Sequence, residues 1–459
     1  MAERPVNKPF QSSDEVFAWI DLHINLERGQ SPKSFSPQRM RLLCELADHP
    51  ELEIPSIHIA GSKGKGSITT MITSILEAAG YKPARYMSPH VTDVRERLCA
   101  GSRFFDEDVY CRAGDEIRKI KENLHAQKSE YFNDVYGEEP TYFELLTLYF
   151  FICARIARRD IMVLETGMGG RLDCTNVVDP LVSIISLIEL EHTKFLGNTI
   201  AEIAGEKAGI IKEGKPVIVG RQQPEALEVF VKTVGAKHSD LLYIPDIVEL
   251  GDIEISRSGT IFTVNYKNGD PSLRLSIPVP GEVQARNAAL SAVAVKTALP
   301  EITGEQIRAG LNNISLPARF ELVSEYPRVI IDGAHTPESI EECASTFQTL
   351  YGIGNVLVFG CAIDKNSLLM AECLVPLFSK IIITTPGTFK VSDPDSAYKN
   401  FYACADKLNS GTETLLLKET ERAFKQAVDY GREKGLAVLC TGSFYLASLA
   451  YEFFNCKKN

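Results

Sequence analysis

The sequence predicts an α/β protein with two domains, each built on a sheet of parallel strands. Short and almost wholly apolar segments, such as IMVLE (161–165) and NVLVFGCA (355–362), alternate with longer segments of helical periodicity. This alternation is typical of parallel strands that helices cover on both faces. The chain has 459 residues, and that length favours two or three domains over one.

The first predicted elements alternate as helix, strand and helix. Helical patterning covers residues 13–49, where SFSPQRMRLLCELADHP has a polar start, an apolar stripe and a final proline. IPSIHIA (54–60) then predicts a buried strand, and SITTMITSILEAAG (67–80) predicts a helix that ends at Gly80. The turn between them is rich in glycine, which is the local context of a phosphate-binding loop.

The rest of the first domain continues this rhythm and then changes character. Residues 241–283 contain alternating segments with hairpin-type turns (IEISRSGTIFTVNY), so we expect a small β insertion there. ARNAALSAVAVKTAL (285–299) returns to helical patterning. Before the insertion, a buried helix is predicted at 142–157 and strands are predicted at 161–165, 181–188 and 216–220.

A second domain is predicted after LPARFE (316–321), which we expect to be a hinge. Five short apolar segments follow it and alternate with helical stretches, as in a compact, doubly wound, Rossmann-like domain. These segments are RVIIDGAH, NVLVFGCA, KIIITTP, TLLLKE and AVLCTGS. The expected domains are therefore residues 1–316, a P-loop-type domain with the β insertion, and residues 317–459.

Composition excludes several classes of protein. The net charge of −11 argues against a nucleic-acid-binding surface, and no apolar stretch reaches the roughly 18–20 residues that span a bilayer. The first residues, MAERPVNKPFQSSDEV, lack the apolar core of a signal peptide. Eleven scattered cysteines without a CxxC pair fit reduced thiols. We therefore expect a cytoplasmic protein without nucleic-acid or membrane partners.

The loop GSKGKGS (61–67) combines three glycines with two lysines. Glycines let backbone N–H groups surround an anion, and the following helix directs its positive end at that anion. Lys65 can reach the outer phosphates of a nucleotide, and Ser67 can ligate Mg²⁺. The strict pattern GxxxxGK[ST] is not met, so a tight turn that merely tolerates glycine is the alternative. The candidate nucleotide-binding residues are Gly61, Ser62, Lys63, Gly64, Lys65, Gly66 and Ser67.

Eight further segments occur in an order that is typical of one enzyme family. They are YMSPHVTDVRERL (86–98), VLETGMGGRLDCTN (163–176), ELEHTKFLGNTIAEIAGEKAGIIKEGKPVI (189–218), QARNAALSA (284–292), PARFE (317–321), DGAHTPESI (332–340), VFGCAIDKN (358–366) and TGSFYLAS (441–448). From about residue 15 to its C-terminus, the chain resembles the folylpolyglutamate synthase and dihydrofolate synthase family of Mur-type ligases. The resemblance implies an ATP-dependent ligase that activates a carboxylate as an acyl phosphate. Glutamate would then attack through its amino group, with dihydropteroate or a folate as the acceptor.

The resemblance also implies roles for individual residues. Family members carry a carbamate on the lysine that matches Lys207, for which an ordinary ion pair with Glu202 or Glu206 is the alternative. The implied magnesium ligands are Ser67, Ser88, Glu165 and His192, and the implied catalytic residues are Lys65, Lys207 and His192. The further nucleotide contacts that the resemblance implies are Asn287, Arg319, Asp332 and His335.

Three residues depart from the usual family pattern. Lys63 replaces Asn in TNGKGS, Glu191 replaces Asp in LDHT, and Thr336 replaces Asn in DGAHNP. Because all three lie near the implied site, they leave the second substrate open. The expected ligands are ATP, Mg²⁺, L-glutamate and a folate or dihydropteroate, and we expect a monomer. The alternatives are a Mur-type ligase that acts on a non-folate carboxylate and a non-catalytic ATP-binding relative.

Overall fold

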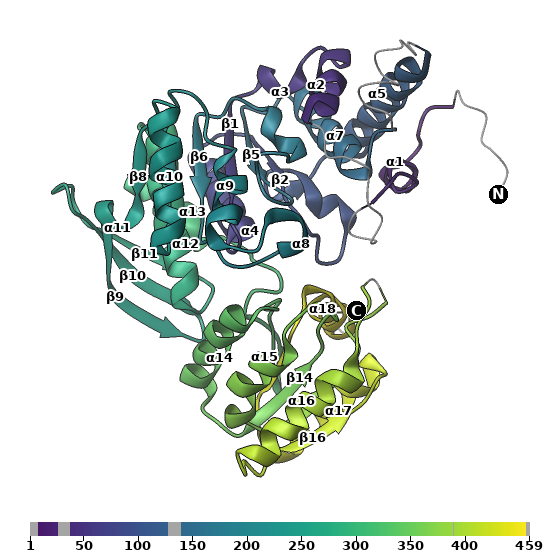
Figure 1. The fold of residues 1–459 in the computed structure, drawn as a ribbon, viewed down its shortest axis with the longest axis vertical. Coiled ribbons are helices and arrows are strands. Elements are labelled where there is room, and N and C mark those ends of the chain that lie inside the picture. The colour runs from purple at the N-terminus through teal and green to yellow at the C-terminus, as the bar shows by residue number, and fades with distance from the viewer. Residues whose placement is uncertain (1–7, 26–36, 127–138, 389, 456–459) are drawn as a thin grey trace.

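The protein consists of an N-terminal lobe with two β-sheets and a C-terminal lobe with one (Figure 1). A computed structural model describes residues 8–25, 37–126, 139–388 and 390–455. Residues 26–36, which belong to the predicted helical stretch 13–49, lie outside the described residues. Within the described ranges, no helix combines the length and the apolar composition that a membrane span requires.

The large sheet of the N-terminal lobe has eight strands. Its central strands are parallel, and the hairpin of β3 and β4 adds an antiparallel edge. In spatial order the strands are β4 (Arg103–Phe104), β3 (Leu98–Ala100), β2 (Pro83–Tyr86), β5 (Ile161–Glu165), β1 (Ser56–Ala60), β6 (Val182–Ile185), β7 (Val217–Val219) and β8 (Leu241–Tyr243).

Strand β5 explains why this sheet is covered on both faces. Met162 and Leu164 pack into one apolar cluster, and Ile161 and Val163 pack into another on the opposite face. This is the two-residue alternation of a strand, and every residue of β5 is buried. Glu165 ends the strand, so its carboxylate lies at the carboxyl edge of the sheet.

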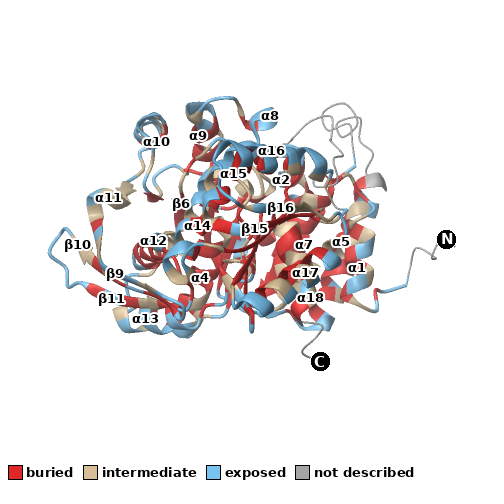
Figure 2. Cartoon of the chain, turned by 90° about the horizontal axis from the view of Figure 1, so that it is seen from below, coloured by how far each residue is buried: buried red, intermediate tan, exposed pale blue. Residues whose placement is uncertain are grey.

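The helices of the N-terminal lobe pack on these two faces and on one another (Figure 1). They are α1 (Ser13–Ile20), α2 (Pro37–Leu46), α3 (Pro50–Glu53), α4 (Lys65–Ala78), α5 (Glu107–Ala126), α7 (Tyr142–Ile156), α8 (Thr193–Leu196), α9 (Ile200–Ala208), α10 (Pro224–Ala236), α11 (Ile244–Ile247), α12 (Glu282–Ala298) and α13 (Gly304–Asn312), with the short 3-10 helices η2 (Val94–Arg97) and η3 (Cys174–Val177). Figure 2 shows buried residues along the strands and the inner helix faces, whereas α10 is largely exposed.

The C-terminal lobe is a six-stranded sheet between helices. Five of its strands run parallel, and the edge strand β12 runs antiparallel to β13. In spatial order they are β12 (Glu321–Glu325), β13 (Arg328–Ile331), β17 (Val438–Thr441), β14 (Asn355–Phe359), β15 (Phe378–Ile383) and β16 (Glu413–Leu416). The helices are α14 (Pro337–Tyr351), α15 (Ser367–Leu374), the 3-10 helix η4 (Val375–Leu377), α16 (Pro394–Lys407), α17 (Thr420–Lys434) and α18 (Phe444–Asn455).

The α/β fold class is confirmed, and two details of the sequence prediction are corrected. The β insertion does not include β8, which extends the large sheet by pairing with β7. The small antiparallel sheet consists of β9 (Val248–Ser256), β10 (Gly259–Tyr266) and β11 (Leu273–Ile277). The antiparallel edge strands β3, β4 and β12 were not predicted, because strands this short or this exposed carry little apolar signal.

A buried ion pair joins α2 to α7 and gives a test of the packing. Arg39 Nε lies 2.8 Å and 2.9 Å from the two carboxylate oxygens of Glu144, and the side chains are 1% and 4% exposed. We expect Arg39→Ala to lower the free energy of unfolding by about 3–5 kcal/mol, because it leaves a buried charge without its partner. Urea unfolding followed by fluorescence measures this, since the single tryptophan, Trp19, packs against the same cluster.

The matched control is Arg112→Ala in α5. Arg112 pairs with Asp108 at 3.2 Å, but these side chains are 61% and 73% exposed, so the substitution should change the unfolding midpoint little. Equal losses in the two variants would contradict the assignment of stability to the buried pair.

Candidate active site

The glycine-rich loop joins β1 to α4 at the carboxyl edge of the large sheet. Gly61 and Gly64 have φ values of +145° and +82°, which favour glycine. A Cβ on Gly61 would lie 1.7 Å from Ser186 Oγ, and a Cβ on Gly64 would lie 2.7 Å from Asn287 Oδ1. The loop therefore requires glycine at both positions for its conformation and for the close approach of its neighbours.

A cavity of about 620 Å³ lies between the two lobes at this loop. Residues from both lobes line it, so neither lobe forms it alone. Of the residues that the sequence predicted as a site, Gly61 and Lys207 lie behind the wall. The others line the cavity: Ser62, Lys63, Gly64, Lys65, Gly66, Ser67, Ser88, Glu165, His192, Asn287, Arg319, Asp332 and His335.

Glu165 is the carboxylate best placed to hold a metal ion. It is 3% exposed, its Oε2 accepts the backbone N–H of Ser88 at 3.2 Å, and Gly66 leaves room for it, since a Cβ there would lie 3.4 Å from Oε2. Burial raises the pKa of Glu165 to about 7, and the nearby charge of Lys65 opposes that rise. A cation beside this carboxylate would favour its ionised form.

The donor set fits Mg²⁺ better than a transition metal. Within the described residues, no group of three or more His, Cys, Asp or Glu side chains could hold a metal ion. Mg²⁺ is commonly held by one or two carboxylates together with water and substrate phosphates, and Glu165 with the hydroxyls of Ser67 and Ser88 offers that arrangement. His192, in the left-handed region at φ +46° before α8, lines the same cavity.

Behind the loop, Lys207 forms an ion pair that the sequence did not predict. Its Nζ donates to Glu191 Oε1 at 2.8 Å and to the carbonyl of Gly61 at 2.9 Å. Lys65 Nζ donates to the same carbonyl at 2.9 Å. The partner of Lys207 is thus neither Glu202 nor Glu206; Glu206 pairs instead with Arg171 at 2.7 Å.

The ion pair is ionised at neutral pH. Burial lowers the pKa of Lys207 to about 8, and Glu191 opposes that shift. Burial by itself would raise the pKa of Glu191, but the charges of Lys207 and Lys65 lower it to about 2. A carbamate on Lys207 would replace this ammonium ion with an anion that faces the Glu191 carboxylate and the Gly61 carbonyl, and the carbamate that the resemblance implies stays a prediction.

The C-terminal lobe contributes an arginine at the hinge. Arg319 lies between Ala318 and Phe320, which have φ values of +55° and +47°, an uncommon left-handed conformation for residues with a side chain. The guanidinium carbon lies 4.1 Å from the ring centre of Phe444. Asp332 secures this hinge, because its Oδ2 accepts the N–H of Phe320 at 2.8 Å.

Phe444 was not predicted as a site residue. It lies in TGSFYLAS, directly after β17, and its ring is 6.2 Å from that of His335. Its position after the carboxyl end of a parallel strand was the available signal. Lys365, after β14, was also missed; its charge, together with burial and Lys63, lowers the pKa of His335 well below the ordinary value.

Asn287 lines the cavity next to the glycine-rich loop. It lies in α12 against Gly64, and its Nδ2 donates to Gln284 Oε1 at 3.2 Å. Pro280, Gly281 and Val283 line the wall next to it. An amide among apolar groups can recognise the edge of a nucleotide base.

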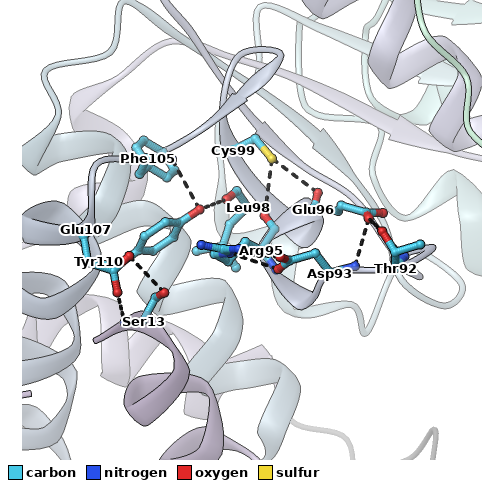
Figure 3. Close-up of polar contacts among 10 residues, drawn as sticks. All are labelled: Ser13, Thr92, Asp93, Arg95, Glu96, Leu98, Cys99, Phe105, Glu107 and Tyr110. Carbon is cyan, nitrogen blue, oxygen red and sulfur yellow. Dashed lines mark hydrogen bonds and ion pairs between the residues drawn. The ribbon is translucent and has the colours of Figure 1, made fainter. Parts of the chain in front are cut away.

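Figure 3 shows how the segment between β2 and β3, which borders the cavity, is held. Glu96 accepts the N–H groups of Thr92 and Asp93 at 3.0 Å and 2.9 Å. Tyr110 of α5 donates its hydroxyl to the carbonyl of Leu98 at 2.8 Å. This side of the cavity is therefore anchored to the helical layer of the N-terminal lobe.

The three departures from the family pattern occupy different places. Lys63 faces the cavity, where Glu189 and Glu191 partly offset the lowering of its pKa by burial. Glu191 lies in the ion pair with Lys207. Thr336 is the N-cap of α14, and its hydroxyl accepts the N–H of Ser339. Its place in the helix cap gives Thr336 a local structural role.

Comparison with known proteins defines the class of this two-lobed site. Residues 117–295 match the Mur ligase middle domain, and residues 318–444 match the Mur ligase, glutamate ligase domain. The chain is therefore a Mur ligase, and within this class it belongs to the folylpolyglutamate synthase and dihydrofolate synthase family.

Individual relatives support this assignment. The chain is 34% identical over 366 residues to the dihydrofolate synthase/folylpolyglutamate synthase of Bacillus subtilis, covering 78% of this chain and 81% of that protein. It is 30% identical over 421 residues to the folylpolyglutamate synthase of Lacticaseibacillus casei, covering 91% and 94%. The structure of Mycobacterium tuberculosis folylpolyglutamate synthase complexed with ADP and AMPPCP is similar with a TM-score of 0.84 and 25% identity, over 96% and 97% of the chains.

His335 gives a test of the electrostatics of the cavity. Its pKa is lowered from 6.5 in the folded protein, so its neutral form stabilises the fold above pH 6.5 and that stability is lost as the pH falls below it. For one such histidine, each pH unit below 6.5 lowers the ratio of folded to unfolded protein by up to about tenfold. We expect His335→Gln to flatten the dependence of unfolding free energy on pH between about 7 and 5, measured without ligand. Parallel curves for variant and wild type would contradict the lowered pKa of His335.

Proposed function

We propose that this protein joins L-glutamate to the carboxylate of a folate, of dihydropteroate, or of both, using ATP. The observation that carries the proposal is the cavity between the lobes, where the glycine-rich loop and Glu165 face Arg319 and His335 of the other lobe. The names of the relatives, and the ADP and AMPPCP in the similar structure, support it.

In this proposal, the loop residues and the N-terminus of α4 bind the phosphates of ATP. Lys65 exchanges the Gly61 carbonyl for the outer phosphates, and Arg319 approaches them from the other lobe. The acceptor carboxylate attacks the γ-phosphorus of ATP, the bond from that phosphorus to the bridging oxygen breaks, and ADP leaves, which gives an acyl phosphate. The glutamate amine then attacks the acyl carbon, loses a proton and expels inorganic phosphate, which gives the amide. Closure of both lobes around the cavity keeps water from the acyl phosphate.

Mg²⁺ belongs to the proposal, with Ser67, Ser88, Glu165 and His192 as its candidate ligands. The ion would neutralise phosphate charge and charge that develops during transfer. The chain's own contribution is to hold Glu165 buried and hydrogen-bonded to Ser88 N–H, so that the carboxylate is already oriented.

The acceptor side of the site lies, in this proposal, at the wall formed by residues 85–97 and 169–176. Tyr86, Phe143 and Leu172 line the cavity there, which suits a flat aromatic ring system. The proposal includes a cytoplasmic location and a monomeric state, which cell fractionation and analytical ultracentrifugation test.

The decisive experiment incubates the purified protein with ATP, Mg²⁺, labelled glutamate and one acceptor at a time. ADP release that requires dihydropteroate assigns dihydrofolate synthesis, and a growing product chain on tetrahydrofolate assigns polyglutamylation. Turnover with an unrelated carboxylate only would assign the non-folate alternative, and no turnover with any acceptor would favour a non-catalytic ATP-binding protein.

Glu165→Gln tests the metal site. We expect product formation to fall by about 100-fold, because the amide removes the charge that would hold the cation. Excess Mg²⁺ should restore part of the rate. The matched control is Glu51→Gln, which alters a carboxylate that is 5% exposed and lies outside the cavity; its rate should match wild type. A Glu165→Gln enzyme with wild-type kinetics would contradict the assignment.

For Lys207, we propose that the ammonium ion positions the loop through Gly61, and that no carbamate forms. Intact-mass measurement in bicarbonate buffer at alkaline pH should then show no added CO₂, and bicarbonate should not change the rate. A CO₂ adduct that disappears in Lys207→Arg would instead establish the carbamate that the resemblance implies.

A further inference from the structure

Three side chains, two of them buried, form a series of hydrogen bonds that runs from the interior of the large sheet to the wall of the cavity. His58 in β1 and Thr175 in η3 are 0% and 1% exposed. His58 Nε2 lies 2.7 Å from Thr175 Oγ1, which lies 2.5 Å from Asp173 Oδ1. Asp173 lines the cavity.

The direction of each bond follows from the donors around Asp173. Its Oδ2 accepts the N–H groups of Gly167 at 2.9 Å and Met168 at 3.1 Å, and its Oδ1 accepts the N–H of Thr175 at 3.0 Å. The carboxylate acts as an acceptor throughout, so the single hydroxyl proton of Thr175 points to Asp173. Thr175 Oγ1 must then accept from His58, which requires the imidazole proton on Nε2.

This tautomer leaves His58 Nδ1 without a proton. Within the described part of the chain, Nδ1 has no hydrogen-bond partner. Burial, reinforced by the charge of Lys212, lowers the pKa of His58 to about 3, so the ring stays neutral. A buried nitrogen without a hydrogen-bond partner lowers the stability of the folded protein.

The hydrogen bonds from His58 through Thr175 to Asp173 end at a turn beside the candidate metal ligand. Gly167 is two residues after Glu165, and a Cβ on Gly167 would lie 3.5 Å from Asp173 Oδ2 and 3.9 Å from Ser88 Oγ. The turn that Asp173 holds therefore joins the candidate metal ligand to the wall at residues 169–176. Gly167 and Met168 both line the cavity.

We propose that His58 is a positioning residue: through Thr175 it fixes Asp173 and the turn at Gly167 and Met168, and so shapes the acceptor side of the cavity. The catalytic consequence rests on the proposed function. The fixing of the turn at Gly167 and Met168 does not rest on the proposed function, because hydrogen exchange of the turn amides measures it directly.

The test compares three substitutions with a control. Thr175→Val keeps the shape and removes the hydroxyl, Thr175→Ser restores it, and His58→Leu removes the donor together with the unpartnered Nδ1. The control, Ser183→Ala, lies beside His58 on β6 and removes a buried hydroxyl that donates to the Ile210 carbonyl at 2.8 Å. Ser183 does not line the cavity.

We expect the amides of residues 166–173 to exchange about tenfold faster in Thr175→Val and His58→Leu, and at the wild-type rate in Thr175→Ser and Ser183→Ala. His58→Leu should retain or gain thermal stability while it loses this protection, which separates positioning from folding. In the ligase assay, the KM for the acceptor should rise about tenfold with the KM for ATP unchanged.

Unchanged exchange at residues 166–173 in Thr175→Val would overturn the proposal, as would equal loosening in Ser183→Ala. A KM for ATP that rises as much as the KM for the acceptor would also overturn it. If wild type turns over no acceptor, the proposed function fails, and the exchange result still decides whether His58 positions the turn. Nitrogen NMR of His58 should find the Nε2–H tautomer from about pH 5 to pH 8, and an Nδ1–H tautomer would refute the assigned hydrogen bonds.

Discussion

The carbonyl of Gly61 is the point on which the site depends. Two lysine amines, from Lys65 in α4 and Lys207 in α9, donate to this one acceptor, and Lys207 is held in turn by Glu191. The Gly61 carbonyl can point toward these two lysines because Gly61 adopts φ +145° in close contact with Ser186, a conformation that favours glycine. The N–H groups of Ser62 and Lys63 donate to the Leu187 carbonyl at 2.8 Å and 3.4 Å, and the start of α4, from Lys65 to Ser67, lines the cavity.

A second constraint comes from the way the lobes meet. Both sheets direct the carboxyl ends of their parallel strands toward the same cavity, so residues after β1, β5, β13 and β17 converge there. Their side chains include both cations and carboxylates from the two lobes, and Arg286 of α12 lies 3.8 Å from the carboxylate of Glu342 of α14. Ser448 of α18 also donates to the carbonyl of Val91, so the lobes touch at the segment between β2 and β3.

The positions of the strands and of the glycine-rich loop could be predicted because each is a local pattern. The all-apolar segment ending at Glu165 and the glycines at 61–67 indicate their structures without knowledge of the rest of the chain. Phe444 was missed although its place directly after β17 was a signal. The partner of Lys207 could not be predicted, since the contact with Glu191 depends on how α9 packs against the loop that precedes α8. The edge strands β4 and β12 were not predicted for another reason. Few of their residues are buried, and strands with few buried residues lack the apolar pattern that marks a buried strand.

By itself the sequence determined the α/β class, the order of most of the elements, and the residue types that surround the cavity, because apolar periodicity and glycine content act over a few residues. Only the tertiary structure decided which charges pair: Lys207 with Glu191 and Arg171 with Glu206. It alone brought His58 into contact with Thr175. Hydrogen bonds and ion pairs act over a few ångströms in space, and only the packed sheet brings such distant residues that close.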